Sequence, residues 1–338
     1  MIKALGVTRS LIVAFLVALL VTAALSGLDV WGLVNDSIIR SGMNMLMVVA
    51  LVPPIRAGAG LNFGLPVGVC CGLLGSVIAV ETGLVGWSGF AVALGCSVPL
   101  SVAAGAGQAW LLERVKGQEM MVGTYVGFAA VALMCMVWLL APFGSPEMVW
   151  ALGGKGLRTT ISLTSSFRQV LDGAAVVRAG QLVLPTGLMA FVAACCWACA
   201  FYLKSSAGLR MAGTGQNPLF AKSCGIDVVR ERRNATIMST LLAAVGICVY
   251  AQSLGFLQLY LAPLMMAFPA VAGILIGGAS IRQAQVSNAV IGTVLLQTLL
   301  TCALPVTQRL IHGNVSEVAR VLLSNGMILY ALTRSHAR

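Results

Sequence analysis

Long apolar segments separated by short polar stretches make up nearly the whole chain. A helix that spans the hydrocarbon core of a bilayer needs about 20 predominantly apolar residues. Segments near or above this length cover residues 11–25, 38–55, 65–80, 84–112, 120–141, 181–203, 235–254, 263–279, 289–304 and, more weakly, 318–332. The pattern predicts an all-α integral membrane protein with about ten transmembrane helices. These helices form one transmembrane domain over residues 1–338.

The predicted spans differ in length. Segments 65–80 and 263–279 are short for a bilayer, whereas 84–112 is long and contains Pro99. A long apolar segment fits a bilayer by tilting or kinking. We therefore expect a tilt or a break at this proline.

Composition excludes a soluble globular protein. Hydrophobic residues make up 59% of the chain and charged residues 9%, whereas soluble domains carry about 25% charged residues. The formal net charge is +11, but the basic residues gather in short clusters between apolar segments. Such clusters are typical of loops that face anionic lipid headgroups. We therefore expect membrane lipid as a partner and no nucleic acid.

The distribution of positive charge predicts the orientation of the chain. Lys3 and Arg9 place the N-terminus in the cytoplasm, and the apolar segment after them is expected to remain as the first helix. Alternate counting of helices then places a polar loop at about 204–234 and the C-terminus in the cytoplasm as well. The loop at about 142–180 becomes external although it contains several basic residues, because long loops follow the charge rule only weakly.

The early segment RAGAGLNFGLPVGVCCG, which starts at Arg56, carries glycines at every fourth position, from Gly60 to Gly72. On a helix these glycines would share one face and allow close packing, but Pro66 interrupts the hydrogen bonding between them. Non-helical backbone at membrane depth is tolerated where it lines a cavity or is buried in protein, and transporters often bind substrate at broken helices. The segment therefore predicts one broken or re-entrant element and a substrate pathway; its candidate residues are Gly60, Asn62, Phe63, Gly64 and Gly68. A glycine-rich packing face with a kink is the alternative.

The polar segment LRMAGTGQNPLFAKSCGIDVVRERR, which starts at Leu209, contains a second candidate element. Asn217 followed by Pro218 is a helix-start signal, with Asn as the cap and Pro at the first helical position. Gly225 is suited to end the helix that follows. The sequence predicts a short cytoplasmic helix over 218–224 that serves as a docking element, and a solvated loop is the alternative.

Candidates for chemistry are few. The segment GGKGLRTT resembles a phosphate-binding loop, but Gly156 stands where Ser or Thr must follow the lysine. Cys196 and Cys199 have the spacing of a redox or metal pair, yet neither a second pair nor a nearby His accompanies them. We expect no catalytic residue, no metal site and no cofactor.

Two other functional classes stay open as alternatives. A secondary transporter driven by an ion gradient predicts acidic or His residues at the membrane midplane, whereas Glu81 and Glu113 lie at the ends of predicted spans. A membrane-embedded enzyme would need a cluster of metal-binding or nucleophilic residues, and the sequence shows no such cluster.

Three segments of the chain, an early one, a middle one and a late one, resemble in their order along the sequence the permease family of bacterial ABC importers for simple sugars, nucleosides and branched-chain amino acids. The most specific is GTGQNPLFAKSCGI, which is similar to the family's cytoplasmic loop at Gly215, Asn217, Ala221, Gly225 and Ile226. The late segment ILIGGASIRQAQVSNAVIGT resembles the family's hairpin at Gly277, Gly278, Ser280, Gly292 and Thr293. The early segment from Gly60 to Gly64 resembles the form found in nucleoside and sugar permeases.

The resemblance implies an architecture and a set of partners. Two permease subunits would pack around the translocation path, cytoplasmic ATP-binding subunits would dock on the coupling helices, and an extracytoplasmic binding protein would deliver the solute. The chain would be a non-catalytic, multi-pass protein of the bacterial cytoplasmic membrane that transports a simple sugar or a nucleoside, with a flavin-like vitamin left open. The residues implied in ATPase coupling are Gly215, Asn217, Pro218, Ala221 and Gly225.

Overall fold

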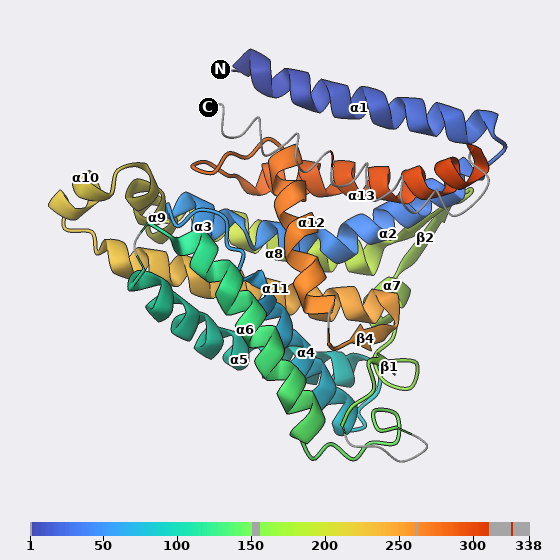
Figure 1. Cartoon of the computed structure of the whole chain (residues 1–338). Coiled ribbons are helices and arrows are strands. Elements are labelled where there is room, and N and C mark those ends of the chain that lie inside the picture. The colour runs from blue at the N-terminus through green and yellow to red at the C-terminus, as the bar shows by residue number, and fades with distance from the viewer. Residues whose placement is uncertain (1, 116, 151–155, 261, 311–325, 327–338) are drawn as a thin grey trace.

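In the computed structural model, the described parts of the predicted spans lie mainly in helices (Figure 1). It describes residues 2–310 except 116, 151–155 and 261, together with residue 326. The long helices are α1 (Ile2–Leu25), α2 (Val30–Val49), α4 (Leu65–Glu81), α5 (Trp87–Glu113), α6 (Glu119–Leu140), α8 (Thr186–Lys204), α11 (Val228–Leu254), α12 (Ala262–Ile276) and α13 (Val286–Leu310). The short helices are α3 (Val52–Arg56), α7 (Val170–Ala174), α9 (Ser206–Gln216) and α10 (Pro218–Ser223). The predicted span 318–332 lies outside the described residues.

Length and composition qualify six of the described helical segments as membrane spans. The segment that joins α2 and α3 is the most buried of them, and α6 is the least buried. The apolar parts of α1, α4 and α12 are shorter than a full span. The chain is thus a mostly helical, multi-pass membrane protein.

Four short strands among the described residues depart from the all-α prediction. They are β1 (Thr160–Ser162), β2 (Val176–Ala179), β3 (Leu182–Pro185) and β4 (Phe256–Gln258). Strand β1 pairs antiparallel with β4, and β2 pairs antiparallel with β3. Because β3 occupies the start of the predicted span 181–203, helix α8 begins only at Thr186.

Helix α5 runs without a break through Pro99, so of the two expected outcomes, a tilt or a break, the break does not occur. Prolines are tolerated inside transmembrane helices because neighbouring helices and local adjustments satisfy the freed backbone groups. Glu81 and Glu113 are the last residues of α4 and α5, as predicted.

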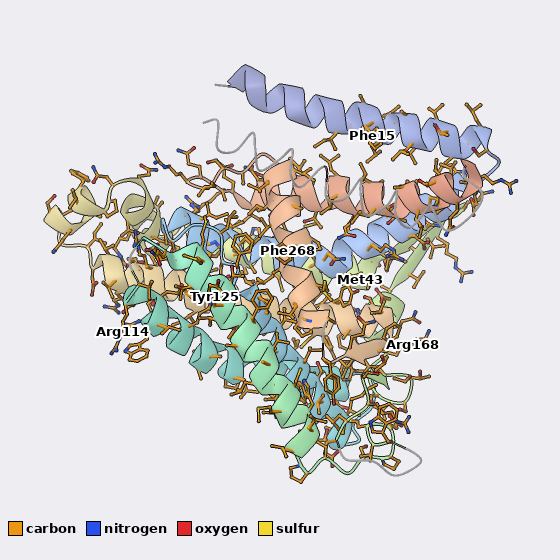
Figure 2. All side chains as sticks on the ribbon, viewed as in Figure 1. Phe15, Met43, Arg114, Tyr125, Arg168 and Phe268 are labelled. Carbon is orange, nitrogen blue, oxygen red and sulfur yellow. The ribbon has the colours of Figure 1, made fainter. Side chains whose placement is uncertain are left out.

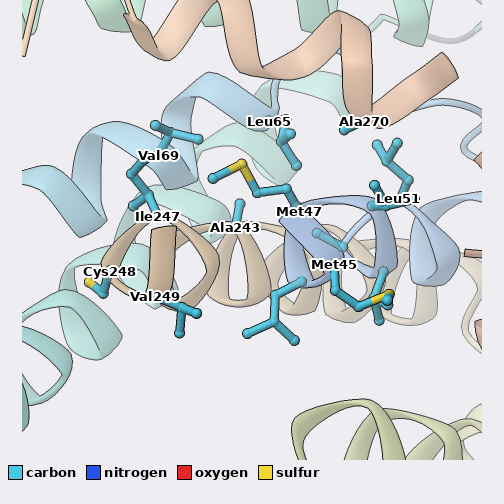
Figure 3. Packing of buried hydrophobic residues seen from close by; sticks show 14 of the residues in the cluster. Met45, Met47, Leu51, Leu65, Val69, Ala243, Ile247, Cys248, Val249 and Ala270 are labelled. Carbon is cyan, nitrogen blue, oxygen red and sulfur yellow. The ribbon is translucent and has the colours of Figure 1, made fainter. Parts of the chain in front are cut away.

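Small residues allow α4, α5 and α11 to pack closely at the centre of the fold. A Cβ atom at Gly68 of α4 would collide with the carbonyl oxygen of Thr240 on α11, and a Cβ atom at Gly75 would lie 2.7 Å from the carbonyl oxygen of Ala93 on α5. In a membrane such close backbone approach replaces the hydrophobic effect as a source of helix association. Figure 3 shows buried side chains of α2, α4, α11 and α12 in the region where these helices pack together.

The described part of the loop at 142–180 forms an ordered cap over the ends of α4 and α11. The backbone N–H groups of Gly144 and Ser145 donate to the carboxylate of Glu81, at 3.1 and 3.2 Å. The backbone N–H of Gln169 donates to the carbonyl oxygen of Gln252 on α11. Figure 1 shows that the cap with β1 and β4 lies at the opposite end of the helices from α10.

Candidate functional site

A non-helical segment, residues 57–64, interrupts the helices between α3 and α4. Gly58 and Gly60 have φ values of +73° and +77°, a left-handed region that side chains with a Cβ atom rarely adopt. Pro66 stands in the first turn of α4, where its missing N–H costs no hydrogen bond. We call residues 57–64 the broken segment. Non-helical backbone thus interrupts the Gly-rich segment, for which the sequence predicted a broken or re-entrant element.

The idea that the glycines share one helix face was wrong. Gly60 and Gly64 lie in the broken segment, and only Gly68 and Gly72 lie on α4, where both face α11. The left-handed turns at Gly58 and Gly60 end the helical repeat, so the four-residue spacing does not translate into a shared face.

Asn62 fastens the broken segment to two helices. Its Oδ1 atom accepts from the backbone N–H of Gly64 at 3.0 Å and from Nε2 of Gln108 on α5 at 2.9 Å. Its Nδ2 atom donates to Oγ of Ser239 on α11 at 3.0 Å. Asn62 and Gln108 are 7% and 3% exposed. The Asn62 amide therefore points into this chain, where it orders the segment, and not toward its surface.

One side-chain atom of Gln108 forms no hydrogen bond within this network. Its Oε1 atom is buried and has no hydrogen-bond partner among the described residues. A buried acceptor without a partner is costly, so a water or a donor group that bound this atom would be stabilising. Sequence reasoning did not identify Gln108, because nothing in α5 marks it as a partner of Asn62.

Two glycines of α6 form a surface on which the broken segment lies. A Cβ atom at Gly127 would be 3.2 Å from the carbonyl oxygen of Phe63 and 3.3 Å from Cγ of Pro66. A Cβ atom at Gly123 would be 3.5 Å from the backbone nitrogen of Gly64. Sequence reasoning missed this pair, although the spacing of small residues at every fourth position of an apolar helix is a known packing signal.

Phe63 of the broken segment is not fully enclosed by this chain. It is half-buried, and its ring lies 6.2 Å from the ring of Phe268 on α12. Phe268 is 49% exposed, and Tyr125 on α6 is 65% exposed. Figure 2 shows Tyr125 and Phe268 on α6 and α12, in front of the other helices. The broken segment thus meets an exposed aromatic face.

The second predicted element, α10, forms as its capping residues indicate. The side chain of Asn217 accepts from the backbone N–H of Phe220 at 3.0 Å, and Pro218 occupies the first turn. The backbone N–H of Ile226 donates to the carbonyl oxygen of Ala221, and Gly225 has a φ of +76°. The predicted helix is confirmed with its C-terminal end one residue earlier, at Ser223. The preceding helix α9 was not predicted.

The apolar side chains of α10 divide between two directions. Ala221 is 2% exposed and packs inside this chain. Leu219 and Phe220 are 82% and 66% exposed, so two large apolar side chains form the tip of a helix that projects from the bundle (Figure 1). Exposed apolar groups of this kind mark interaction sites. A partner that meets α10 would therefore contact Leu219 and Phe220, whereas Ala221 keeps α10 in place.

The broken segment and the α9–α10 element touch through two glycines. A Cβ atom at Gly215, near the end of α9, would lie 2.9 Å from the backbone nitrogen of Gly58 and would collide with the carbonyl oxygen of Arg56. Arg232 of α11 donates from Nη2 to the carbonyl oxygen of Gly58 at 3.3 Å and pairs with Glu119 of α6 at 3.5 Å. The two predicted sites therefore lie side by side.

The late glycine-rich hairpin is a close contact between α12 and α13. A Cβ atom at Gly292 would collide with the carbonyl oxygen of Gly273, and one at Gly277 would collide with that of Asn288. These glycines are needed because the two backbones touch.

Within the described residues, no group of three or more His, Cys, Asp or Glu side chains is placed to hold a metal ion. Cys196 and Cys199 are both free thiols.

Comparison with known proteins places the chain in a family. The family model described as branched-chain amino acid transport system, permease component, matches residues 38–332. The match begins within α2 and includes the broken segment, the α9–α10 element and the glycine hairpin. No curated protein and no solved structure matches the chain. The chain belongs to the permease family of branched-chain amino acid transport systems.

Proposed function

We propose that this chain lines the translocation path for a small polar solute, a simple sugar or a nucleoside. Family membership makes it the membrane component of an ABC transport system, in which an ATPase and a binding protein are separate partners. The observation that carries the proposal is the exposed tip of α10, formed by Leu219 and Phe220, on an element that touches the broken segment. The chain itself would transmit ATP-driven movement without catalysing a reaction.

An uncharged solute fits the surroundings of the broken segment better than an amino acid does. The carboxylate and ammonium groups of an amino acid need opposite charges when they leave water. The basic side chains nearest to the segment, Arg56 and Arg232, donate to the carbonyl oxygens of Leu203 and Gly58. Phe63 and Phe268 offer apolar ring faces that suit the face of a sugar or a base.

We infer the orientation from charge. The end that carries α9 and α10 contains Lys204, Arg210, Lys222, Arg230 and Arg233 and would face the cytoplasm by the positive-inside rule. Both termini would lie on the same side of the bacterial cytoplasmic membrane.

The cap at 142–180 would then be external, where the binding protein delivers the solute. Together with Phe256 of β4, the cap forms a hollow of about 550 Å³ that is lined by Glu147, Arg158 and several hydroxyl groups. Side chains of both charges at a surface hollow suit a transient contact with another protein.

A second permease subunit would cover the face of α6 and α12. Tyr125 and Phe268 lie on this face, and Phe63 of the broken segment reaches it. A path between two subunits at this face would let the broken segment contact the solute through Phe63, while the Asn62 amide holds the segment from behind.

Replacing Leu219 or Phe220 with Asp should reduce binding of the ATP-binding subunit by at least about 10-fold, because an apolar anchor at the centre of an interface contributes about 2 kcal/mol or more. Solute-stimulated ATP hydrolysis should fall in parallel. The measurement is pull-down of the ATP-binding subunit with the purified variants, together with hydrolysis in reconstituted vesicles.

Leu84→Asp is the matched control, since it introduces the same charge at an exposed leucine of the opposite end. It should bind the ATP-binding subunit normally. Normal binding by both α10 variants would mean that the tip of α10 is not the docking surface.

A further inference from the structure

The contact between Gly58 and Gly215 joins the element that would receive the ATPase to the element that would face the solute. We propose that this contact is the joint through which movement of α9 and α10 reaches the broken segment, with Arg232 as its clamp. The inference rests on the proposed function and adds the residues that would transmit the movement.

The two backbones are in direct contact at this joint, so one cannot move toward the other without displacing it. A Cβ atom at Gly58 would lie 2.8 Å from Cα of Gly215, and a Cβ atom at Gly215 would lie 2.9 Å from the nitrogen of Gly58. Flexible side chains absorb a displacement by changing rotamer, whereas two backbones in contact must move together. A shift of α9 toward the bundle therefore displaces the broken segment.

Helices α9 and α10 are bonded to each other, so they can move together. The backbone N–H of Asn217 donates to the carbonyl oxygen of Gly213, so the cap of α10 is bonded to α9. The buried Ala221 further holds α10 against the chain. Arg210 of α9 pairs with Glu231 of α11 at 3.1 Å, and Glu231 is 5% exposed. A displacement of the α10 tip thus reaches Gly215 through short, fixed contacts.

Arg232 connects the joint to a second helix, α6. Its guanidinium binds the carbonyl oxygen of Gly58 and the carboxylate of Glu119 at the start of α6. Helix α6 in turn contacts the far end of the broken segment through Gly123 and Gly127. The clamp therefore ties both ends of the broken segment to the same movement, which would change the exposure of Phe63.

Gly215→Ala should separate ATP hydrolysis from transport. The added methyl group forces the two backbones apart, so we expect solute transported per ATP hydrolysed to fall at least tenfold while the ATP-binding subunit remains bound. Gly213→Ala is the matched control: it lies on the same helix, and no described atom is within 4 Å of its Cβ position. It should couple normally. Both variants are measured in vesicles that contain the complete transporter.

A second pair of variants tests the same proposal if Gly215→Ala fails to fold. Arg232→Met removes the clamp but leaves both glycines in place, and Arg233→Met removes the neighbouring exposed arginine. The first should lower the coupling ratio and the second should not. Phe63→Cys serves as a reporter: its labelling rate should change on ATP binding in the unmodified background and in Arg233→Met, and should stay constant in Arg232→Met.

Unchanged coupling ratios in folded Gly215→Ala and in Arg232→Met would contradict the proposed role of the joint while leaving the proposed function intact. If no ATP-binding subunit associates even with the unmodified chain, the joint and the proposed function both fail.

Discussion

Gly68→Leu is expected to abolish solute uptake and to lower the melting temperature of the purified protein by several degrees. Gly68 is a point of closest approach between α4 and α11, where a Cβ atom would collide with the carbonyl oxygen of Thr240 and lie 2.8 Å from Cβ of Ala243. Overpacking usually costs about 1–3 kcal/mol, and here the obstacle includes backbone. A leucine must push the two helices apart, which moves the start of α4 and the broken segment with it.

The measurements are thermal unfolding in detergent and uptake by reconstituted vesicles. Gly95→Leu is the control, because Gly95 also lies in a membrane helix and has no described atom within 4 Å of its Cβ position. It should unfold and transport like the unmodified chain. Because α10 lies far from Gly68, the folded fraction of Gly68→Leu should still bind the ATP-binding subunit. Normal uptake by Gly68→Leu would show that α4 and α11 need not touch.

The second large effect is expected from Asn62→Leu. The substitution removes the hydrogen-bond partner of Gln108 on α5, of Ser239 on α11 and of the Gly64 backbone. Each buried polar group left without a partner costs about 1–3 kcal/mol. The broken segment would lose its attachment to both helices, so uptake should fall at least tenfold.

A double-mutant cycle tests whether the lost hydrogen bond between Asn62 and Gln108 causes this effect. Gln108→Leu removes the stranded amide, so the pair Asn62→Leu with Gln108→Leu should be less destabilised than the sum of the single variants, by about 0.5–3 kcal/mol. Asn44→Leu is the control, since the Asn44 amide donates to the carbonyl oxygen of Arg40 on its own helix. Strictly additive effects would mean that the amide pair does not hold the segment.

Features that depend on local sequence could be predicted. Apolar length located the membrane helices, and the Asn217 cap, Pro218 and Gly225 located α10, because capping acts within one turn. The broken helix followed from glycines and a proline in an apolar context. The basic clusters gave an orientation that the proposal still uses.

Features that depend on partners distant in the sequence could not be predicted. Strand β1 forms only because β4 lies beside it in the fold, and the Gly58–Gly215 contact needs α3 and α9 to meet. Asn62 was predicted as a substrate contact from its polarity alone. Its orientation toward Gln108 and Ser239 depends on two helices that its own segment does not specify.

The central claim is that this membrane component is driven by a separate ATPase docked on α10. The most direct test is uptake of labelled simple sugars, nucleosides and branched-chain amino acids into vesicles that contain the chain, the ATP-binding subunit and the binding protein. We predict uptake of a sugar or a nucleoside that requires ATP and the ATP-binding subunit, is lost in Leu219→Asp, and persists when ionophores dissipate all ion gradients. Uptake that follows an ion gradient and proceeds without the ATP-binding subunit would contradict the account.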